Sequence, residues 1–249
     1  MISNPLSGAA YFIKGLSLIQ RTGVKRFVII PLVINILIFT LMFWLLGGYV
    51  SDWLDSMTSS LPDWLAWLSY LIWLLFAFSA GIILFFGFSI VANLVGAPFN
   101  GFLAGAVEKS LTGKDPVDDS GRSLMQEVSY AMSGELRKIL YFLMWGVPLL
   151  IMSFIPAINL VAPFLWALFS AWMMAIEYGD YPLGNHGMNF VDIRNKLGEK
   201  KILSLGFGGA VMIGTMIPLF NFLVMPVAVA GATAMRVEQF PLGESQGTK

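Results

Sequence analysis

Two long stretches without a charged residue limit what this chain can fold into. They cover residues 27–50 and 64–107, in a chain of 249 residues that is 57% hydrophobic and only 12% charged. Soluble domains carry about 25% charged residues, and about 20 apolar residues in a helix cross the roughly 30 Å hydrocarbon core of a bilayer. We predict an all-α integral membrane protein with spanning helices at 26–50 and 64–96, the second ending or bending at 96–98.

Composition also excludes several classes of function. The net charge is zero, so no surplus of Lys and Arg exists to neutralise nucleic-acid phosphates. Cysteine is absent and His186 is the one histidine, which argues against a metal site. We find no nucleophile motif and no phosphate-binding loop. We therefore expect a single membrane domain over residues 1–249 that is not an enzyme and uses no cofactor.

Two further apolar stretches look like copies of each other. Residues 139–176 and 202–235 each begin after basic residues and break at an Ile-Pro pair (Ile155-Pro156 and Ile217-Pro218), and each has an acidic residue soon after its end, Glu177 and Glu238. We predict two helical hairpins related by a parallel internal repeat. Their arms are short for a full span, so the hairpins either half-penetrate the bilayer or just cross it. The second hairpin carries glycines expected to allow close helix packing, namely Gly206, Gly208, Gly209 and Gly214.

The basic residues predict the orientation. With two crossings and two returning hairpins, all of them fall on one side, and the connector 51–63 has none. The positive-inside rule places the basic side in the cytoplasm. Residues 4–22 separate polar and apolar stripes, as in a helix that lies at the membrane interface.

The segment before the first span is a candidate anion site. Gly23 lets the backbone approach a ligand closely, Lys25 and Arg26 supply positive charge, and the start of a helix favours anions. The alternative is that these cations are positive-inside anchors that bind lipid headgroups.

A second candidate joins the two hairpins. It is rich in groups that form hydrogen bonds and ion pairs: Glu177, Asp180, Asn185, His186 and Arg194. These residues form either a polar network that fixes the hairpins or relays protons, or a capped turn before an amphipathic helix. Asn159 and Asn221, each three residues after an Ile-Pro proline, either line a polar pathway or cap broken helices.

Three motifs in this order resemble the CysZ family of bacterial sulfate permeases, over residues of about 5 to 240. They are Gly23-Val24-Lys25-Arg26-Phe27 with Pro31 and Asn35, Val95 to Asn100, and Glu177 to Pro182 followed by Asn185, His186 and Phe190. The resemblance implies two long transmembrane helices and two hairpins that partly penetrate the bilayer. It also implies an oligomer, a dimer or a multiple of dimers, in the bacterial inner membrane.

The family resemblance further implies sulfate uptake for cysteine biosynthesis. Its Gly-Leu-Arg sulfate-binding motif maps here onto Gly23, Val24, Lys25 and Arg26, with Val24 in place of Leu and Lys25 in place of Arg. Lysine keeps the charge but lacks the planar fork of arginine. The expected partners are sulfate, membrane lipids and other copies of the chain. The alternatives are a permease for sulfite or thiosulfate and a membrane scaffold that transports nothing.

Overall fold

The computed structural model describes residues 4–58, 62, 66–114, 124–218 and 220–242. The described part is helical, with no strand in these ranges: α1 (Pro5–Leu18), α2 (Arg26–Thr58), α3 (Ala66–Thr112), α4 (Leu124–Ser153), η2 (Ile158–Leu160), α5 (Ala162–Gly184), α6 (Phe190–Gly198), α7 (Lys201–Thr215) and α8 (Asn221–Gln239). The contacts divide the chain into two units, residues 1–26 with 100–249, and residues 27–99. The all-α prediction is confirmed for the described residues.

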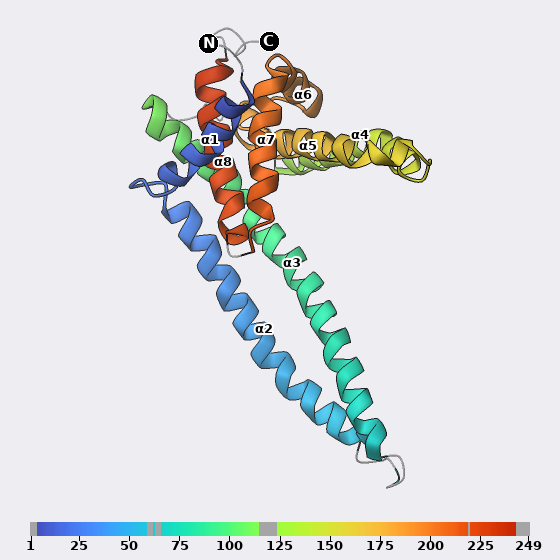
Figure 1. Ribbon diagram of the computed structural model, residues 1–249. Helices are drawn as coiled ribbons and strands as arrows, with labels where there is room; N and C mark the ends of the chain where they lie inside the picture. Colours follow the sequence, from blue (N-terminus) through green and yellow to red (C-terminus); the bar gives the residue numbers. More distant parts are fainter. Residues whose placement is uncertain (1–3, 59–61, 63–65, 115–123, 219, 243–249) are drawn as a thin grey trace. The chain divides into compact units, whose positions relative to one another are not determined.

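The second unit contains most of α2 and the first part of α3, which run in opposite directions (Figure 1). α2 extends to Thr58, beyond the predicted end at residue 50, and Arg26–Trp44 is long and apolar enough to cross a membrane. The sequence predicts that the second span ends or bends at residues 96–98. An end there is wrong, because α3 continues to Thr112. Apolar surroundings favour an unbroken backbone ladder, and membrane helices tolerate an internal proline such as Pro31 of α2.

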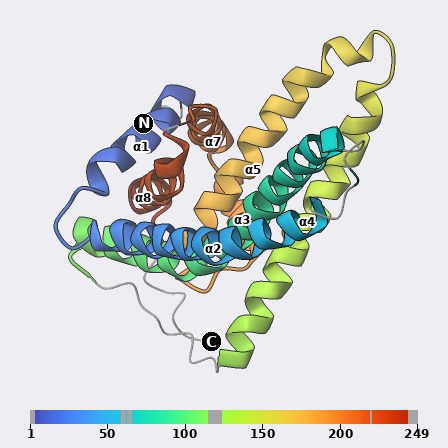
Figure 2. The ribbon, with the colours of Figure 1, turned by 90° about the horizontal axis from the view of Figure 1, so that it is seen from below.

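In the first unit, α1 packs against both α7 and α8 (Figures 1 and 2). Its start is capped by the Asn4 side chain, which accepts a hydrogen bond from the Leu6 amide at 3.0 Å. Glycines allow the backbones to touch: a Cβ on Gly8 would lie 2.0 Å from the Leu203 carbonyl oxygen of α7. α1 thus contacts both arms of the second hairpin at backbone distance.

α5 packs against α7 and α8 as well. A Cβ on Gly208 would lie 1.8 Å from the Ala171 carbonyl oxygen of α5, so this crossing also depends on glycine. α1, α5, α7 and α8 supply most of the fully buried side chains, among them Phe207, Ile176 and Leu18. This helix cluster is the core of the first unit.

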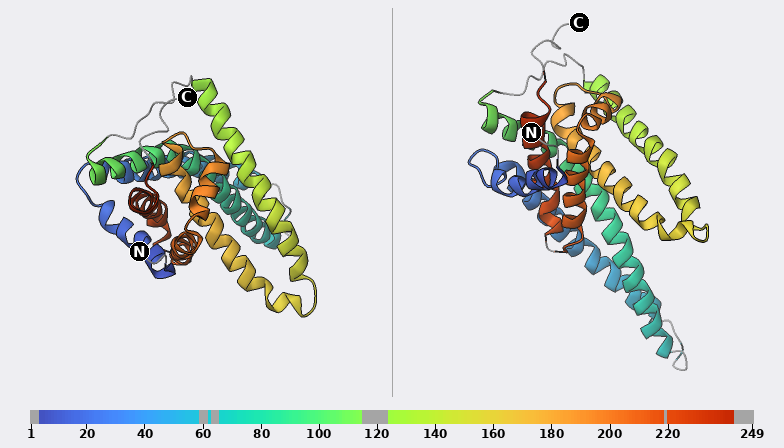
Figure 3. Two further views of the ribbon diagram at one scale, coloured as in Figure 1. Left: turned by 90° about the horizontal axis from the view of Figure 1, so that it is seen from above. Right: turned by 45° about the horizontal axis from the view of Figure 1, so that its top comes forward.

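Both helix pairs turn at the Ile-Pro sequences (Figure 3 shows the α4–α5 turn at the tip of the pair). The Asn159 amide donates to the Ile155 carbonyl at 3.0 Å, and the Asn221 amide donates to the Ile217 carbonyl at 2.9 Å. The donor and the acceptor of the second bond each lie 62 residues after those of the first (221 − 159 and 217 − 155). The same offset relates the bonds of Phe154 and Ile155 to those of Met216 and Ile217. The two turns therefore share one backbone pattern.

The arms differ in length from the prediction. α4 begins at Leu124, so the polar residues before position 139 are continuous with the predicted first arm in one helix that contains Pro148. Its part Ser133–Ser153 has 21 residues and is long and apolar enough to cross a membrane, whereas α7, Lys201–Thr215, is shorter. α5 continues to Gly184 and α8 to Gln239, beyond residues 176 and 235.

Candidate functional site

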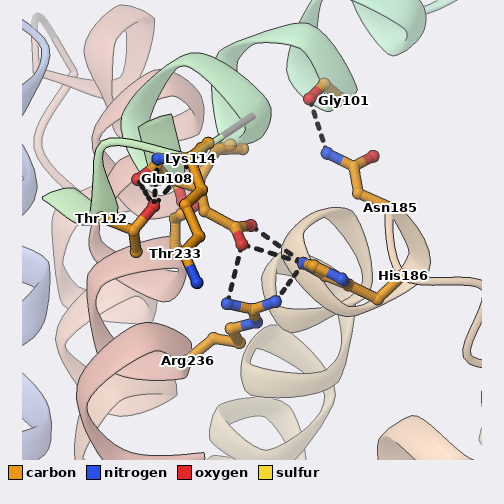
Figure 4. A network of polar contacts seen from close by, with 9 residues as sticks. Gly101, Glu108, Thr112, Lys114, Asn185, His186, Thr233 and Arg236 are labelled. Carbon is orange, nitrogen blue, oxygen red and sulfur yellow. Dashed lines mark hydrogen bonds and ion pairs between the residues drawn. The ribbon is translucent and has the colours of Figure 1, made fainter. Parts of the chain in front are cut away.

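The end of α3 carries a buried ion cluster, formed by Glu108, His186 and Arg236 (the Glu108 cluster; Figure 4). Arg236 Nη1 lies 2.9 Å from Glu108 Oε1, and His186 Nε2 lies 3.0 Å from both carboxylate oxygens of Glu108. The Glu108 and Arg236 side chains are only 7% and 8% exposed. The cluster joins α3 to α8 and to the turn that follows α5.

The protonation of His186 decides which contacts the Glu108 cluster can make. Arg236 Nη2 also contacts His186 Nε2. Nε2 can accept a hydrogen bond from Arg236 only without a proton, and it can donate to Glu108 only with one. The two contacts therefore belong to alternative tautomers or protonation states of His186.

The Arg236 side chain is buried, and Glu108 is its counterion. Burial lowers the pKa of its guanidinium, and the charge of Glu108 opposes that shift. Its Nε is buried and has no hydrogen-bond partner among the described residues. Removal of Glu108 would thus leave a buried cation without its counterion, which is strongly unfavourable.

The last turns of α3 are held by further polar contacts. Asn185 Nδ2 donates to the Gly101 carbonyl at 2.9 Å, and Asn100 Nδ2 lies 3.2 Å from Met225 Sδ (Figure 4 shows the first). The helix ends at Gly113, whose φ of 73° and hydrogen bond to the Lys109 carbonyl form a glycine C-cap. Residues 100–112 are therefore fixed at both ends and at Glu108.

A second cluster surrounds Lys138 at the base of the first hairpin (the Lys138 cluster). Lys138 Nζ lies 2.6 Å from Asp180, 2.8 Å from Glu135 and 3.2 Å from Glu177, and its side chain is only 9% exposed. Glu177 and Asp180 tie the middle of α4 to the last turns of α5, while Glu135 pairs with Lys138 within α4.

The polar network predicted between the hairpins is thus divided between different partners. Glu177 and Asp180 bind Lys138, whereas Asn185 and His186 bind α3. Arg194 lies over the Tyr141 ring, 5.6 Å from its centroid, and donates to Asn195 Oδ1 at 3.2 Å. Sequence reasoning missed Glu108, Lys138 and Arg236 as members. The one sequence feature that could have indicated them is that each is a charged residue next to an apolar stretch.

Tyr178 lies beside the Lys138 cluster and gives a pH-dependent prediction. Burial, reinforced by Tyr181 and Glu177, raises the pKa of the Tyr178 phenol to about 12. An unfolded tyrosine titrates near 10, so the folded state binds more protons between these values, and stability is lost as the pH rises through them. We expect unfolding in detergent to become easier from pH ~10 upward, with a shallower dependence in Tyr178→Phe. Equal slopes for the two proteins would contradict the assignment.

The predicted anion-binding residues lie in the basic loop (residues 21–26), a turn that ends at Arg26, the first residue of α2. Gly23 has φ of 89°, in the left-handed region that favours glycine, and a Cβ there would meet nothing within 4 Å. Val24 is buried, whereas Lys25 and Arg26 are exposed. The Val24 and Lys25 amides donate to the Arg21 carbonyl at 3.1 and 3.2 Å. These two amides stabilise the turn, and the cationic side chains of Arg21, Lys25 and Arg26 are exposed to solvent.

Asn159 and Asn221 lie in the hairpin turns with exposed side chains. The N-cap residues of α5 and α8 are Val161 and Phe220, and neither helix has a side-chain cap hydrogen bond. The capping alternative is therefore wrong for these helices. Each asparagine closes its turn through the backbone amide instead.

A comparison with protein families supplies independent information. The family model described as Sulfate transporter CysZ/Etoposide-induced protein 2.4 matches residues 11–226. The match runs from the second half of α1 to the first turns of α8, and so includes the basic loop, Glu108 and His186 but not Arg236.

Proposed function

Because the chain belongs to the family of the sulfate transporter CysZ and etoposide-induced protein 2.4, we propose that it carries sulfate across the bacterial inner membrane for cysteine biosynthesis. The family is one of transporters, and two described helices are long and apolar enough to cross a membrane, as expected for a membrane protein. Its multi-pass arrangement, with the basic side in the cytoplasm, is part of the proposal.

The observation that carries the choice of an anion is the chemistry of the basic loop. Exposed Lys25 and Arg26 stand at the start of an apolar helix, beside a glycine whose open side would admit a ligand. A doubly charged oxyanion gains from charged donors and from the positive end of the helix dipole. We assign sulfate binding to Gly23, Val24, Lys25 and Arg26, with Val24 anchoring the turn by its burial.

The remaining path is proposed from the hairpins. Exposed Asn159 and Asn221 offer polar side chains at the tips of two otherwise apolar helix pairs. Backbone groups at such turns must be covered by protein or face water inside a bilayer. We propose that copies of the chain assemble as a dimer or a multiple of dimers and enclose these turns, and that sulfate moves down its gradient or with an ion.

Sulfate uptake into proteoliposomes tests the assignment. The variant Lys25→Ala/Arg26→Ala removes two charged donors, and each hydrogen bond from such a donor contributes about 1.5–3 kcal/mol. We therefore expect sulfate uptake at low sulfate concentration to fall at least about tenfold. Lys196→Ala is the matched control, because Lys196 of α6 pairs with Glu199, the C-cap residue of that helix, and lies outside the basic loop. Unchanged uptake in the double variant would reject the site.

The same assay separates the alternatives. Sulfite and thiosulfate are compact anions that the same cations would attract, so a permease for either would show stronger competition by that anion than by unlabelled sulfate. A scaffold that transports nothing would show no saturable sulfate binding, and Lys25 and Arg26 would then contact lipid headgroups.

A further inference from the structure

The Glu108 cluster and the basic loop are connected through the end of α3. Arg21 Nη1 donates to the Ser110 carbonyl at 3.5 Å, two residues after Glu108. The Arg21 carbonyl accepts the Val24 and Lys25 amides. One residue therefore binds α3 with its side chain and holds the turn of the basic loop with its backbone.

The position of Ser110 depends in turn on the Glu108 cluster. Ser110 lies in the last turn before the glycine C-cap, where a helix end frays unless other contacts hold it. Glu108 is the group in that turn with buried ionic partners, Arg236 of α8 and His186 after α5. The Thr112 hydroxyl adds a hydrogen bond to the Glu108 carbonyl at 2.9 Å. A contiguous series of contacts thus leads from α8 through α3 to the basic loop.

We propose that Glu108, Arg236 and Arg21 are positioning residues for the sulfate site: the buried ion pair holds the end of α3, and α3 holds the basic loop through Arg21. The inference rests on the proposed function only in naming sulfate as the ligand. Binding geometry then depends on a side chain of α8 that is far from the loop in sequence and does not itself touch the anion.

A double-mutant cycle on sulfate affinity tests this coupling. Glu108→Gln keeps the shape but removes the charge, and Arg21→Gln removes the contact with Ser110 at an exposed position. We expect each single variant to raise the sulfate Kd about fivefold, and the double variant to raise it about fivefold rather than the roughly 25-fold of independent effects. Arg236→Lys, which retains a charge opposite Glu108, is expected to recover part of the affinity lost in Arg236→Met.

Asp180→Asn is the control for a general loss of protein stability. This variant removes one of the carboxylates that pair with Lys138 of α4, and it changes none of the three residues of the Glu108 cluster. Its sulfate Kd should stay within about twofold of the parent protein. A Kd raised as much by Asp180→Asn as by Glu108→Gln, or full additivity of Glu108→Gln and Arg21→Gln, would overturn the proposal.

Hydrogen exchange separates this inference from the proposed function, because it needs no sulfate. The Val24 and Lys25 amides should exchange about tenfold faster in Glu108→Gln and in Arg21→Gln than in the parent or in Asp180→Asn. If the parent protein binds no sulfate but the exchange pattern holds, the ligand is wrong and the coupling stands. If exchange at these amides is unaltered in both variants, the coupling fails whatever the ligand.

Discussion

Gly206→Ala and Gly208→Ala should destabilise the first unit, whereas Gly209→Ala should leave it unchanged or more stable. A Cβ on Gly206 would lie 2.0 Å from the Pro5 carbonyl oxygen, and one on Gly208 would lie 1.8 Å from that of Ala171. Both neighbours are backbone, so helices must separate to relieve the overlap. At Gly209 the nearest atom is a side-chain carbon at 4.0 Å, which is ordinary contact.

The three substitutions share one helix and one chemical change, and therefore control one another. Alanine has the higher helix propensity by about 1 kcal/mol, a gain that Gly209→Ala should realise. Overpacking costs about 1–3 kcal/mol or more, which should outweigh that gain at Gly206 and Gly208. Thermal unfolding followed by circular dichroism in detergent would measure the difference. Equal midpoints for all three variants would show that α7 does not cross α1 and α5 at these glycines.

Removal of one member of the buried Glu108–Arg236 pair should destabilise the protein more than removal of both. Glu108→Leu leaves the Arg236 guanidinium buried beside His186 without its counterion, and such changes cost about 3–5 kcal/mol. Glu108→Leu/Arg236→Met removes both charges and should recover much of that loss, because apolar replacements of buried pairs are often neutral or stabilising.

The ion pair between Lys196 of α6 and Glu199, the C-cap residue of that helix, supplies the comparison. Glu199, 56% exposed, pairs with Lys196 at 3.1 Å, and Glu199→Gln should cost less than about 1 kcal/mol because solvent screens the charges. Denaturation in detergent would compare the parent protein with Glu108→Leu, Arg236→Met, the double variant and Glu199→Gln. If the double variant is as unstable as the sum of the two single changes, Glu108 and Arg236 do not stabilise each other.

Much of the helical architecture was predictable from local patterns. Charge-free stretches predicted long apolar helices, and the repeated Ile-Pro pairs predicted the turns after α4 and α7, because proline disfavours helical backbone in the residue before it. Helix ends were predicted less well. α3 continues through Gly96–Pro98, since an apolar setting keeps backbone hydrogen bonds intact where local propensity favours a break. α4 begins at Leu124, well before the arm predicted from residue 139.

In the candidate sites, too, local features were predictable from the sequence and long-range contacts were not. The basic loop was predictable from Gly23, Lys25 and Arg26, which are neighbours in sequence. The sequence did not reveal that the Arg21 carbonyl takes up two amides of that loop. The predicted network of five polar residues separated into groups with different partners, because each group pairs with a helix distant in sequence, α4 or α3.

By itself, the sequence determined the membrane environment, the helical class, the two turns and the family, because hydrophobicity, proline and short motifs act locally along the chain. Only the tertiary structure decided that α1 lies against α7 and α8, and that Glu108 meets His186 and Arg236. In the sequence, Glu108 is 78 positions from His186 and 128 positions from Arg236 (236 − 108). Contacts of this kind depend on glycine crossings and on the burial of charge. Neither the glycine crossings nor the buried ion pairs can be predicted before the helices are placed against one another.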